Sequence, residues 1–230
     1  SNNNTNNNSS SSNNSKEGKL PAGGASALEW LEVASKARMG RVQSLALEFQ
    51  SRYCPSTLSM QALELKQLLH LNSVSSLPLE EQIVLVDVRS PEERQVSTIN
   101  VMGSLLLSKQ QFTATAGVIL QTYKQVVCFC TVGGRSGVFC NEVARQPSLI
   151  GMSPAHSELI AKKMCNASGG IAAWLHIGGT LVDPQFQTTR KVTPWCQAFV
   201  DLFPVEGVEL VLDEQSEPPT EAIRFVSAFV

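Results

Sequence analysis

The residues best suited to chemistry lie close together in one window of the chain, residues 126–138. An apolar run ends at Cys130, two glycines follow within four residues, and Arg135 comes next. The thiolate is the nucleophilic form of cysteine, and a guanidinium, inward-facing backbone N–H groups and the positive end of a helix all stabilise it. The window therefore predicts Cys130 as a nucleophile beside an anion-binding loop. The residues predicted to line that loop are Thr131, Val132, Gly133, Gly134, Arg135 and Ser136.

Two runs of apolar, largely β-branched residues must position this loop, one at 83–88 and the other at 125–130. Such runs are typical of strands covered on both faces, and the helix-compatible sequence between them predicts a parallel α/β sheet. Ligands of such sheets bind beyond the carboxyl ends of the strands, where Cys130 would lie. Ser136 is expected to cap the helix that follows and runs through Val143.

Cys130 also has a simpler interpretation, because a cysteine at a strand end is often a small buried hydrophobic residue. The coincidence of strand, cysteine, glycine pair, arginine and helix cap within seven residues favours the nucleophile instead. Asp87 and Arg89 flank the end of the first run near the same sheet edge, and we expect them to support the site by holding loops together. Ser90 and Glu93 predict a capping box at the start of a helix.

Composition excludes several classes of protein. With 18 lysines and arginines against 20 aspartates and glutamates, the formal net charge is −2, which argues against nucleic acid or an acidic membrane surface as a partner. No apolar run approaches the ~20 residues needed to span a bilayer. The six cysteines and three histidines show neither metal-ligand spacing nor a paired disulfide framework. We therefore expect no metal, and reduced thiols in an intracellular compartment.

Three blocks of the sequence resemble, in order and spacing, the signatures of the rhodanese-like sulfurtransferase family. They are LVDVRSPEE at residues 85–93, CTVGGRSG at residues 130–137 and GGIAAW at residues 169–174. The resemblance implies an α/β fold with a parallel five-stranded sheet and helices on both faces.

The resemblance also divides the chain into parts. The rhodanese-like domain would span residues 57–182, preceded by a helical extension that is one long helix or two helices broken near Gly40. The Asn/Ser-rich start has almost no apolar surface to bury and is expected to be disordered. The parts are a disordered segment and linker at 1–24, N-terminal helices at 25–56, the domain at 57–182, and a C-terminal extension at 183–230 with helices around Thr193–Phe203 and Thr220–Val230.

The family's chemistry would place a persulfide on Cys130. The resemblance implies that Cys130 takes the outer sulfur of a small anionic donor, such as thiosulfate or a mercapto acid, or of a protein persulfide. It would pass that sulfur to a thiol, to an acceptor protein or to cyanide. The backbone amides of residues 131–136 would surround the persulfide, Arg135 would attract the donor, and no metal or organic cofactor would be needed.

Other activities remain open from the sequence. Four residues separate Cys130 from Arg135, whereas related dual-specificity phosphatases have five in a wider loop, so a phosphatase is the weaker prediction. Arsenate reduction on a similar loop is a further alternative. A different class is a non-catalytic interaction or regulatory module, because a fold alone does not determine function.

Overall fold

The computed structural model describes residues 27–212. The predictions for residues 1–24 and for a helix at Thr220–Val230 therefore lie outside the described residues. The centre of the molecule is a five-stranded sheet with the order β1-β6-β5-β2-β4, in which every neighbouring pair is parallel. Its strands are β1 (Leu58–Met60), β2 (Ile83–Asp87), β4 (Leu106–Ser108), β5 (Gln125–Phe129) and β6 (Met164–Ala167).

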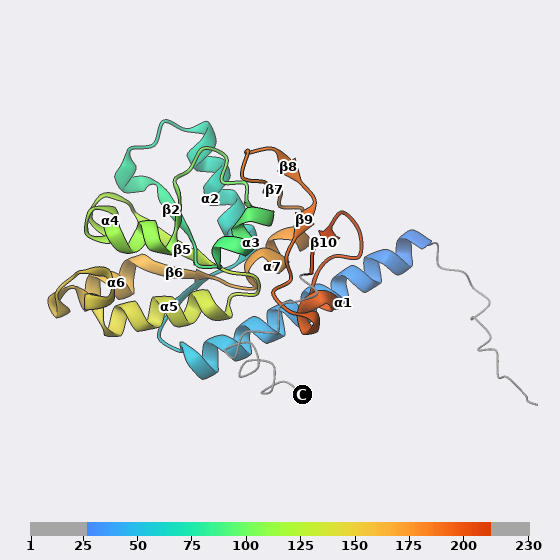
Figure 1. Ribbon diagram of the computed structural model, residues 1–230, viewed down its shortest axis with the longest axis horizontal. Helices are drawn as coiled ribbons and strands as arrows, with labels where there is room; N and C mark the ends of the chain where they lie inside the picture. Colours follow the sequence, from blue (N-terminus) through green and yellow to red (C-terminus); the bar gives the residue numbers. More distant parts are fainter. Residues whose placement is uncertain (1–26, 213–230) are drawn as a thin grey trace, which may run out of the picture.

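Helices cover both faces of this sheet, so the predicted α/β layering is confirmed (Figure 1). Successive side chains of β2 and β5 point to opposite faces, and each set enters a different apolar core. The core that holds Leu85 and Val127 contains residues of α1 (Ala27–Tyr53), α2 (Ala62–Val74) and α7 (Gly170–His176). The core that holds Val86 and Cys128 contains residues of α4 (Lys109–Thr122), α5 (Gly134–Arg145) and α6 (Ser157–Lys163).

Helix starts follow the local sequence at two places and depart from it at a third. The capping box of Ser90 and Glu93 begins α3 (Pro91–Val96), as predicted, and Ser108 with Gln111 forms another before α4. The predicted cap of α5 is wrong. Gly133, with φ of +87°, is the N-cap and the helix begins at Gly134, so Ser136 lies in the first turn and the helix ends at Arg145.

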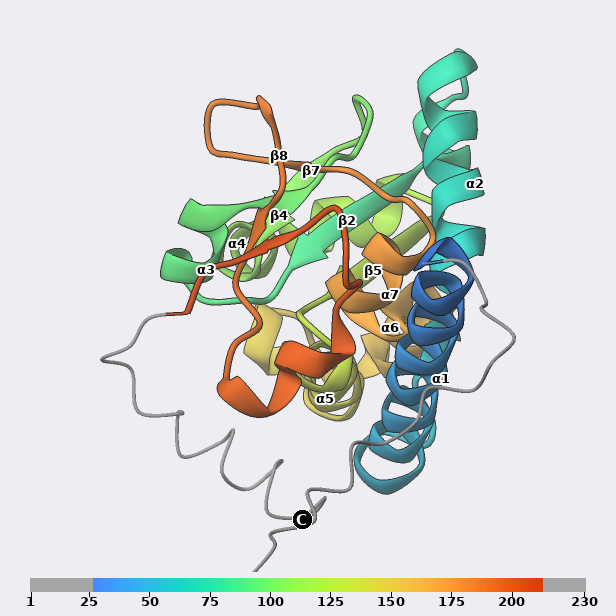
Figure 2. The ribbon, with the colours of Figure 1, turned by 90° about the vertical axis from the view of Figure 1, so that its right-hand side faces the viewer.

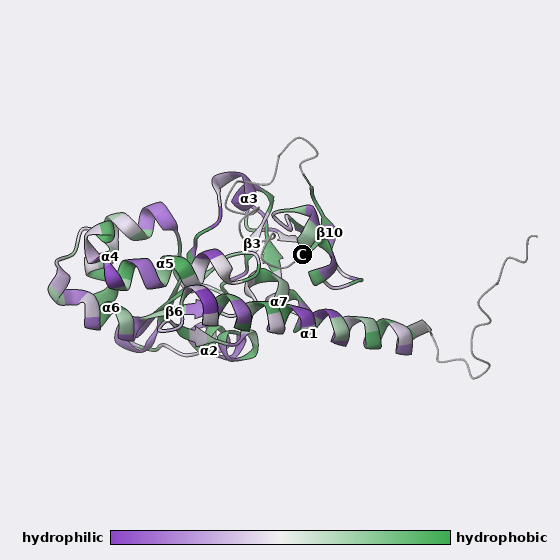
Figure 3. Ribbon diagram, turned by 90° about the horizontal axis from the view of Figure 1, so that it is seen from below, coloured by the Kyte–Doolittle hydropathy of each residue, from purple (hydrophilic) through white to green (hydrophobic). Residues whose placement is uncertain are grey.

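The N-terminal extension is one helix rather than two. α1 runs without a break through Gly40, and the space beside that glycine is open. Its second half is buried at Val42 and Phe49, where it packs against α5 and α7. Its first half extends beyond the rest of the described chain and exposes Leu28 and Trp30 (Figure 3).

The C-terminal extension packs on the domain. β7 (Leu181–Val182) pairs with β3 (Thr98–Ile99) and β8 (Thr188–Thr189), and β9 (Lys191–Val192) pairs with β10 (Glu209–Leu210). β9 lies against α3, and the 3₁₀ helix η4 (Gln197–Leu202) lies against α1 (Figure 2). The remaining 3₁₀ turns are η1 (Leu79–Glu81), η2 (Pro147–Ile150) and η3 (Pro154–His156).

The helix predicted around Thr193–Phe203 is only partly formed. Trp195 has a left-handed backbone with φ of +73°, and Cys196 is extended with φ of −152°. Helical geometry therefore begins only at Gln197 and is of the tighter 3₁₀ type. Within residues 27–212, no helix combines the length and the apolar character needed to cross a bilayer.

Candidate functional site

Cys130 directly follows β5, at the carboxyl edge of the sheet where the sequence places the reactive group. The loop turns back on the sulfur, so that the Gly133 N–H donates to Cys130 Sγ across 3.2 Å. The positive φ of Gly133 makes this turn possible, since side-chain-bearing residues rarely adopt it. The cysteine is nevertheless only 1 % exposed. The sulfur that the sequence predicts to be reachable is therefore covered in this conformation.

Ser136 approaches the same sulfur from the first turn of α5. Its Oγ lies 3.4 Å from Cys130 Sγ and 2.6 Å from Asn166 Oδ1 on β6. A hydroxyl has one proton to donate, and the shorter contact to an amide oxygen uses it. The Ser136 oxygen can then accept from a Cys130 thiol, whereas a thiolate would attract the hydroxyl proton to itself.

The start of α7 holds the loop from the other side. Ile171 and Ala172 donate backbone N–H groups to the carbonyls of Cys130 and Thr131, both at 3.0 Å. Gly170, with φ of +52°, lies so close that a Cβ there would meet the Cys130 carbonyl oxygen at 2.2 Å. The glycine pair at 169–170 thus lets the backbone at the start of α7 contact the loop closely.

Arg135 is held by a carboxylate within the domain. Its Nη1 and Nη2 donate to Glu93 Oε2 and Oε1, both at 2.7 Å, and Nη2 also donates to Thr131 Oγ1 at 3.0 Å. Thr131 in turn donates to Glu93 Oε1 at 3.1 Å. The side chains of Arg135 and Glu93 are 15 % and 7 % exposed. The guanidinium expected to attract a donor anion already has an anionic partner.

This ion pair changes the titration of both groups. Burial alone would raise the pKa of Glu93, but the hydrogen bonds and charge of Arg135 outweigh burial and lower it. Burial would likewise lower the pKa of Arg135, and Glu93 together with the nearby Cys130 sulfur raises it instead. Both groups therefore stay charged at neutral pH. Arg135 Nε is buried and has no hydrogen-bond partner among the described residues.

An aromatic side chain of the C-terminal extension packs against the guanidinium of Arg135. The Arg135 guanidinium carbon lies 4.2 Å from the centre of the Trp195 ring, within the range of a cation–π contact. Trp195 also packs on Phe199, with ring centres 5.8 Å apart. On the inner side, the Phe49 ring of α1 would lie 3.3 Å from a Cβ on Gly134.

Asp87 and Arg89 lie at the end of β2 and tie the following segment to it. Arg89 Nη2 donates to Asp87 Oδ2 at 2.7 Å and to the Ser97 carbonyl at 2.6 Å, and Thr98 Oγ1 donates to Asp87 Oδ2 at 3.0 Å. These contacts agree with the expected role of holding loops together. Arg89 also adds positive charge near Glu93, which helps to lower the pKa of that carboxyl.

Three residues at the site were not identified from the sequence. The sequence already explains Glu93 as part of a capping box, so its ion pair with Arg135 is not evident from the sequence. Asn166 carries a usable signal, because a polar residue inside the short apolar strand β6 is 4 % exposed and must find a partner. Trp195 carries none, since it lies 60 positions after Arg135 in a segment without a motif.

The other thiols differ from Cys130 in their surroundings. All six cysteines are free and buried. Burial raises the pKa of Cys54 to about 11 and that of Cys165 to about 12, so both remain thiols at neutral pH. Cys128 lies in the apolar core with Cys140, as expected from its place deeper in β5.

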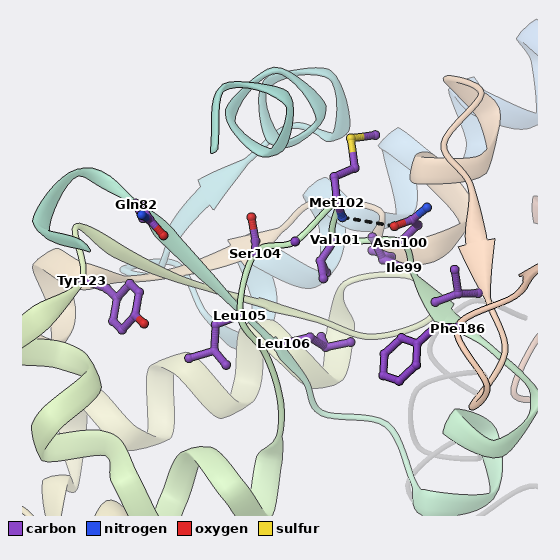
Figure 4. A pocket seen from close by; sticks show the side chains of 12 residues that line it. Gln82, Ile99, Asn100, Val101, Met102, Ser104, Leu105, Leu106, Tyr123 and Phe186 are labelled. Carbon is purple, nitrogen blue, oxygen red and sulfur yellow. Dashed lines mark hydrogen bonds between the residues drawn. The ribbon is translucent and has the colours of Figure 1, made fainter. Parts of the chain in front are cut away.

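The described surface also has a pocket away from this loop. A pocket of about 480 Å³ lies beside β4, between Tyr123 at one end and Phe186 at the other (Figure 4). It contains none of the predicted site residues. Among residues 27–212, no group of three or more histidine, cysteine or acidic side chains is placed to hold a metal ion.

Comparisons with known proteins identify no family for this chain. No family model matches the chain, and no curated protein matches it. Among solved structures, the crystal structure of the BH2092 protein from Bacillus halodurans is similar over 55 % of this chain and 77 % of that chain, with 14 % sequence identity and a TM-score of 0.36. A likeness of this extent identifies neither a family nor an activity for this chain.

Proposed function

We propose that this chain is a rhodanese-like sulfurtransferase, which carries a sulfane sulfur as a persulfide on Cys130. The observation that carries the proposal is the Gly133 N–H directed at Cys130 Sγ, 3.2 Å away, at the carboxyl end of a central parallel strand. An N–H donor at this position stabilises negative charge on sulfur. The N–H groups of residues 134–136 begin a helix and have no partner within it, so they add positive potential at the same place.

The reaction proceeds in two balanced steps. The Cys130 thiolate attacks the outer sulfur of thiosulfate, the new S–S bond forms as the old one breaks, and sulfite leaves with the electron pair of the broken bond. Cyanide, or a thiolate acceptor, then attacks the outer sulfur of the persulfide. The Cys130–sulfur bond breaks, thiocyanate or a new persulfide leaves, and the Cys130 thiolate returns. Each step is a nucleophilic substitution, and no external oxidant or reductant takes part.

One N–H group of Arg135 is available to bind the anionic sulfur donor. Its two terminal nitrogens are engaged by Glu93, while its buried Nε has no partner in the described part of the chain. A buried donor without a partner is costly, and an anionic oxygen of the donor would satisfy it. In the proposed enzyme, Arg135 Nε and the loop amides therefore bind the donor, and Glu93 positions the guanidinium.

One observation favours a second candidate, a non-catalytic interaction module. Cys130 is 1 % exposed and Arg135 is already paired, so this conformation offers no open route to the sulfur. A module that binds a partner through its surface would need neither group to be accessible. The two candidates differ in whether Cys130 acquires sulfur at all.

The deciding experiment measures thiocyanate formed from thiosulfate and cyanide, together with the intact mass of the protein after exposure to thiosulfate alone. We expect the wild type to gain one sulfur atom on Cys130. Cys130→Ser should lose both the added sulfur and more than about 10³-fold of the turnover. The matched control is Cys165→Ala on the neighbouring strand β6, whose thiol has a pKa of about 12 and should be unreactive.

Turnover and sulfur loading that survive in Cys130→Ser would remove Cys130 from the mechanism. Absence of both in the wild type would favour the interaction module. Hydrolysis of an aryl phosphate that depends on Cys130, without any sulfur loading, would instead point to phosphate chemistry on the same loop.

A further inference from the structure

A short piece of the C-terminal extension, residues 193–200 and here called the lid, lies against the Cys130 loop at Arg135. The lid places Trp195 over Arg135 at 4.2 Å and packs Phe199 against Trp195. Phe199 and Cys196 also enter the same apolar core as Val132 of the loop. The lid therefore contacts the charged side chain of the loop and shares an apolar core with it.

The chain on each side of the lid is fixed to other elements by hydrogen bonds. Before it, β9 is joined to β10 by backbone bonds of 2.7 and 2.9 Å. After it, three side chains of α1 and α7 donate to consecutive carbonyls over distances of 2.8 to 3.1 Å. These donors are Arg41 to Asp201, His176 to Leu202, and Arg38 to Phe203. A segment held at both ends in this way can swing outward without releasing the extension.

The backbone of the lid is itself under strain. Trp195 has φ of +73°, a left-handed conformation that bulky side chains rarely adopt. Such a conformation persists only where surrounding contacts hold it, and it is frequent at ligand clamps and switch regions. The contacts of its ring with Arg135 and Phe199 are among those that hold it here. Loss of the cation–π contact would therefore release strain as the lid moves.

There is also room for that movement. A groove of about 610 Å³ lies between part of η4 and α1, lined by Phe199 of the lid, by Leu202 just after the lid, and by Arg41 and Leu45 of α1. The groove means that η4 is not packed tightly against α1 along its whole length. Among the described residues, no strand of the central sheet lines this groove.

We infer that residues 193–200 are an autoinhibitory lid, which seals Cys130 at rest and opens to admit the sulfur donor. The inference rests on the proposed function, because it takes Cys130 as the reactive sulfur. A donor anion bound at Arg135 Nε would neutralise part of the guanidinium charge and so weaken its attraction to the Trp195 ring. The substrate itself is therefore the expected opening signal.

The test compares two variants of the full chain by the rate at which iodoacetamide alkylates Cys130, followed by peptide mass spectrometry. Trp195→Gly removes the ring, and glycine accepts the left-handed backbone without strain. Phe186→Gly is the matched control, since Phe186 is an aromatic residue of the same extension with φ of +60° and is 80 % exposed. We expect Cys130 alkylation to rise at least about tenfold in Trp195→Gly and to stay unchanged in Phe186→Gly.

Cys165 serves as the internal reference for global unfolding, because it is buried in the core at 2 % exposure. An unchanged rate at Cys130 in Trp195→Gly would overturn the lid. A rise at Cys130 and Cys165 together would also overturn it, because it would show general loosening rather than a local cover. A second variant, Trp195→Phe, retains an aromatic ring and should alkylate at nearly the wild-type rate.

The failure of the lid and the failure of the proposed function give different results. Alkylation reports access to the thiol and needs no sulfur transfer. Faster alkylation in Trp195→Gly without thiocyanate from any variant would support the lid and reject the sulfurtransferase. Thiocyanate formation that depends on Cys130, with no change in alkylation, would support the enzyme and reject the lid.

Discussion

At the scale of single residues, the positive charge expected near Cys130 comes from two different sources. The Arg135 side chain is largely balanced by Glu93, which accepts two hydrogen bonds of 2.7 Å from it. The Gly133 N–H, in contrast, is directed at the sulfur itself. Stabilisation of a Cys130 anion therefore depends on the backbone first, and Glu93 fixes where the guanidinium points.

Replacement of Glu93 tests how much its ion pair with Arg135 contributes to stability. Glu93→Gln keeps the shape of the side chain and its capping ability but removes the charge that faces Arg135. We expect the free energy of unfolding to fall by roughly 3 kcal/mol at neutral pH, because a buried guanidinium loses its partner. The pKa of Glu93 lies below its ordinary value of 4.5, so the wild-type advantage is complete at neutral pH and is lost as the pH falls through the folded-state pKa.

Urea unfolding of both proteins, from neutral pH down to about pH 3, measures the effect. The two stability curves should converge in acid, because protonated Glu93 no longer neutralises Arg135. Glu80→Gln is the control, since Glu80 is exposed in η1 and should change stability by less than about 0.5 kcal/mol. Curves that stay parallel across the pH range would show that the ion pair is not the source of the difference.

At the scale of elements, the site is assembled where the start of α7 meets the loop after β5. Two N–H groups of the first turn of α7 satisfy the carbonyls of Cys130 and Thr131. Gly169 and Gly170 both have positive φ, so the chain can bring that turn against the loop backbone. The position of Cys130 is thus set by α7 as well as by β5.

A methyl group at position 170 would disturb this junction. Gly170→Ala would place its Cβ 2.2 Å from the Cys130 carbonyl oxygen, so loop and helix must separate. Gly178→Ala is the matched control, because it also has positive φ but nothing nearer than the Lys66 ammonium at 3.9 Å. We expect urea unfolding to show that Gly170→Ala costs at least about 1 kcal/mol more than Gly178→Ala. Equal costs would mean that backbone strain alone, and not the contact, explains the loss.

Several elements could be predicted from the sequence because their signals are local. β2 and β5 are buried on both faces, and this requires continuous apolar runs that are easy to recognise. The capping box of Ser90 and Glu93 depends on two residues three positions apart. The cap of α5 could not be predicted in the same way, because the Ser136 hydroxyl is drawn to Asn166, 30 positions away, and Gly133 provides the turn.

The closure of the site was beyond prediction for a related reason. The pairing of Arg135 with Glu93 joins residues 42 positions apart, and the stacking of Trp195 depends on how the extension folds back over the domain. Each contact involves a residue type with several common roles. The sequence therefore placed the loop at the end of β5, but it could not reveal the side chains that pair with Arg135 and stack on it.

At the scale of the whole molecule, α1 is part of the core although it precedes the domain predicted from the sequence. Val42 and Phe49 are 0 % and 2 % exposed and belong to the same apolar cluster as Trp174 of α7. Val42 would lie 2.8 Å from a Cβ on Gly169, and Phe49 would lie 3.3 Å from one on Gly134. The helix thus supports both glycine-containing turns of the site.

Truncation of Phe49 tests whether α1 folds together with the domain. Phe49→Ala should lower the free energy of unfolding by roughly 3–5 kcal/mol, as expected for a large buried aromatic residue. Leu47→Ala, on the same helix but 62 % exposed, should change it by less than about 0.5 kcal/mol. Urea unfolding followed by circular dichroism and by fluorescence should give one coincident transition. A cost for Phe49→Ala no larger than that for Leu47→Ala would show that α1 is only an appendage.

The contact between Gly170 and the Cys130 carbonyl limits how the sequence can vary among relatives of this chain. The contact involves the main chain at position 130, so it persists whatever side chain that position carries. A relative with another small residue at position 130 would still need glycine at position 170 to bring α7 against the loop. Among relatives of this chain, the glycine at position 170 should therefore vary less than the residue at position 130.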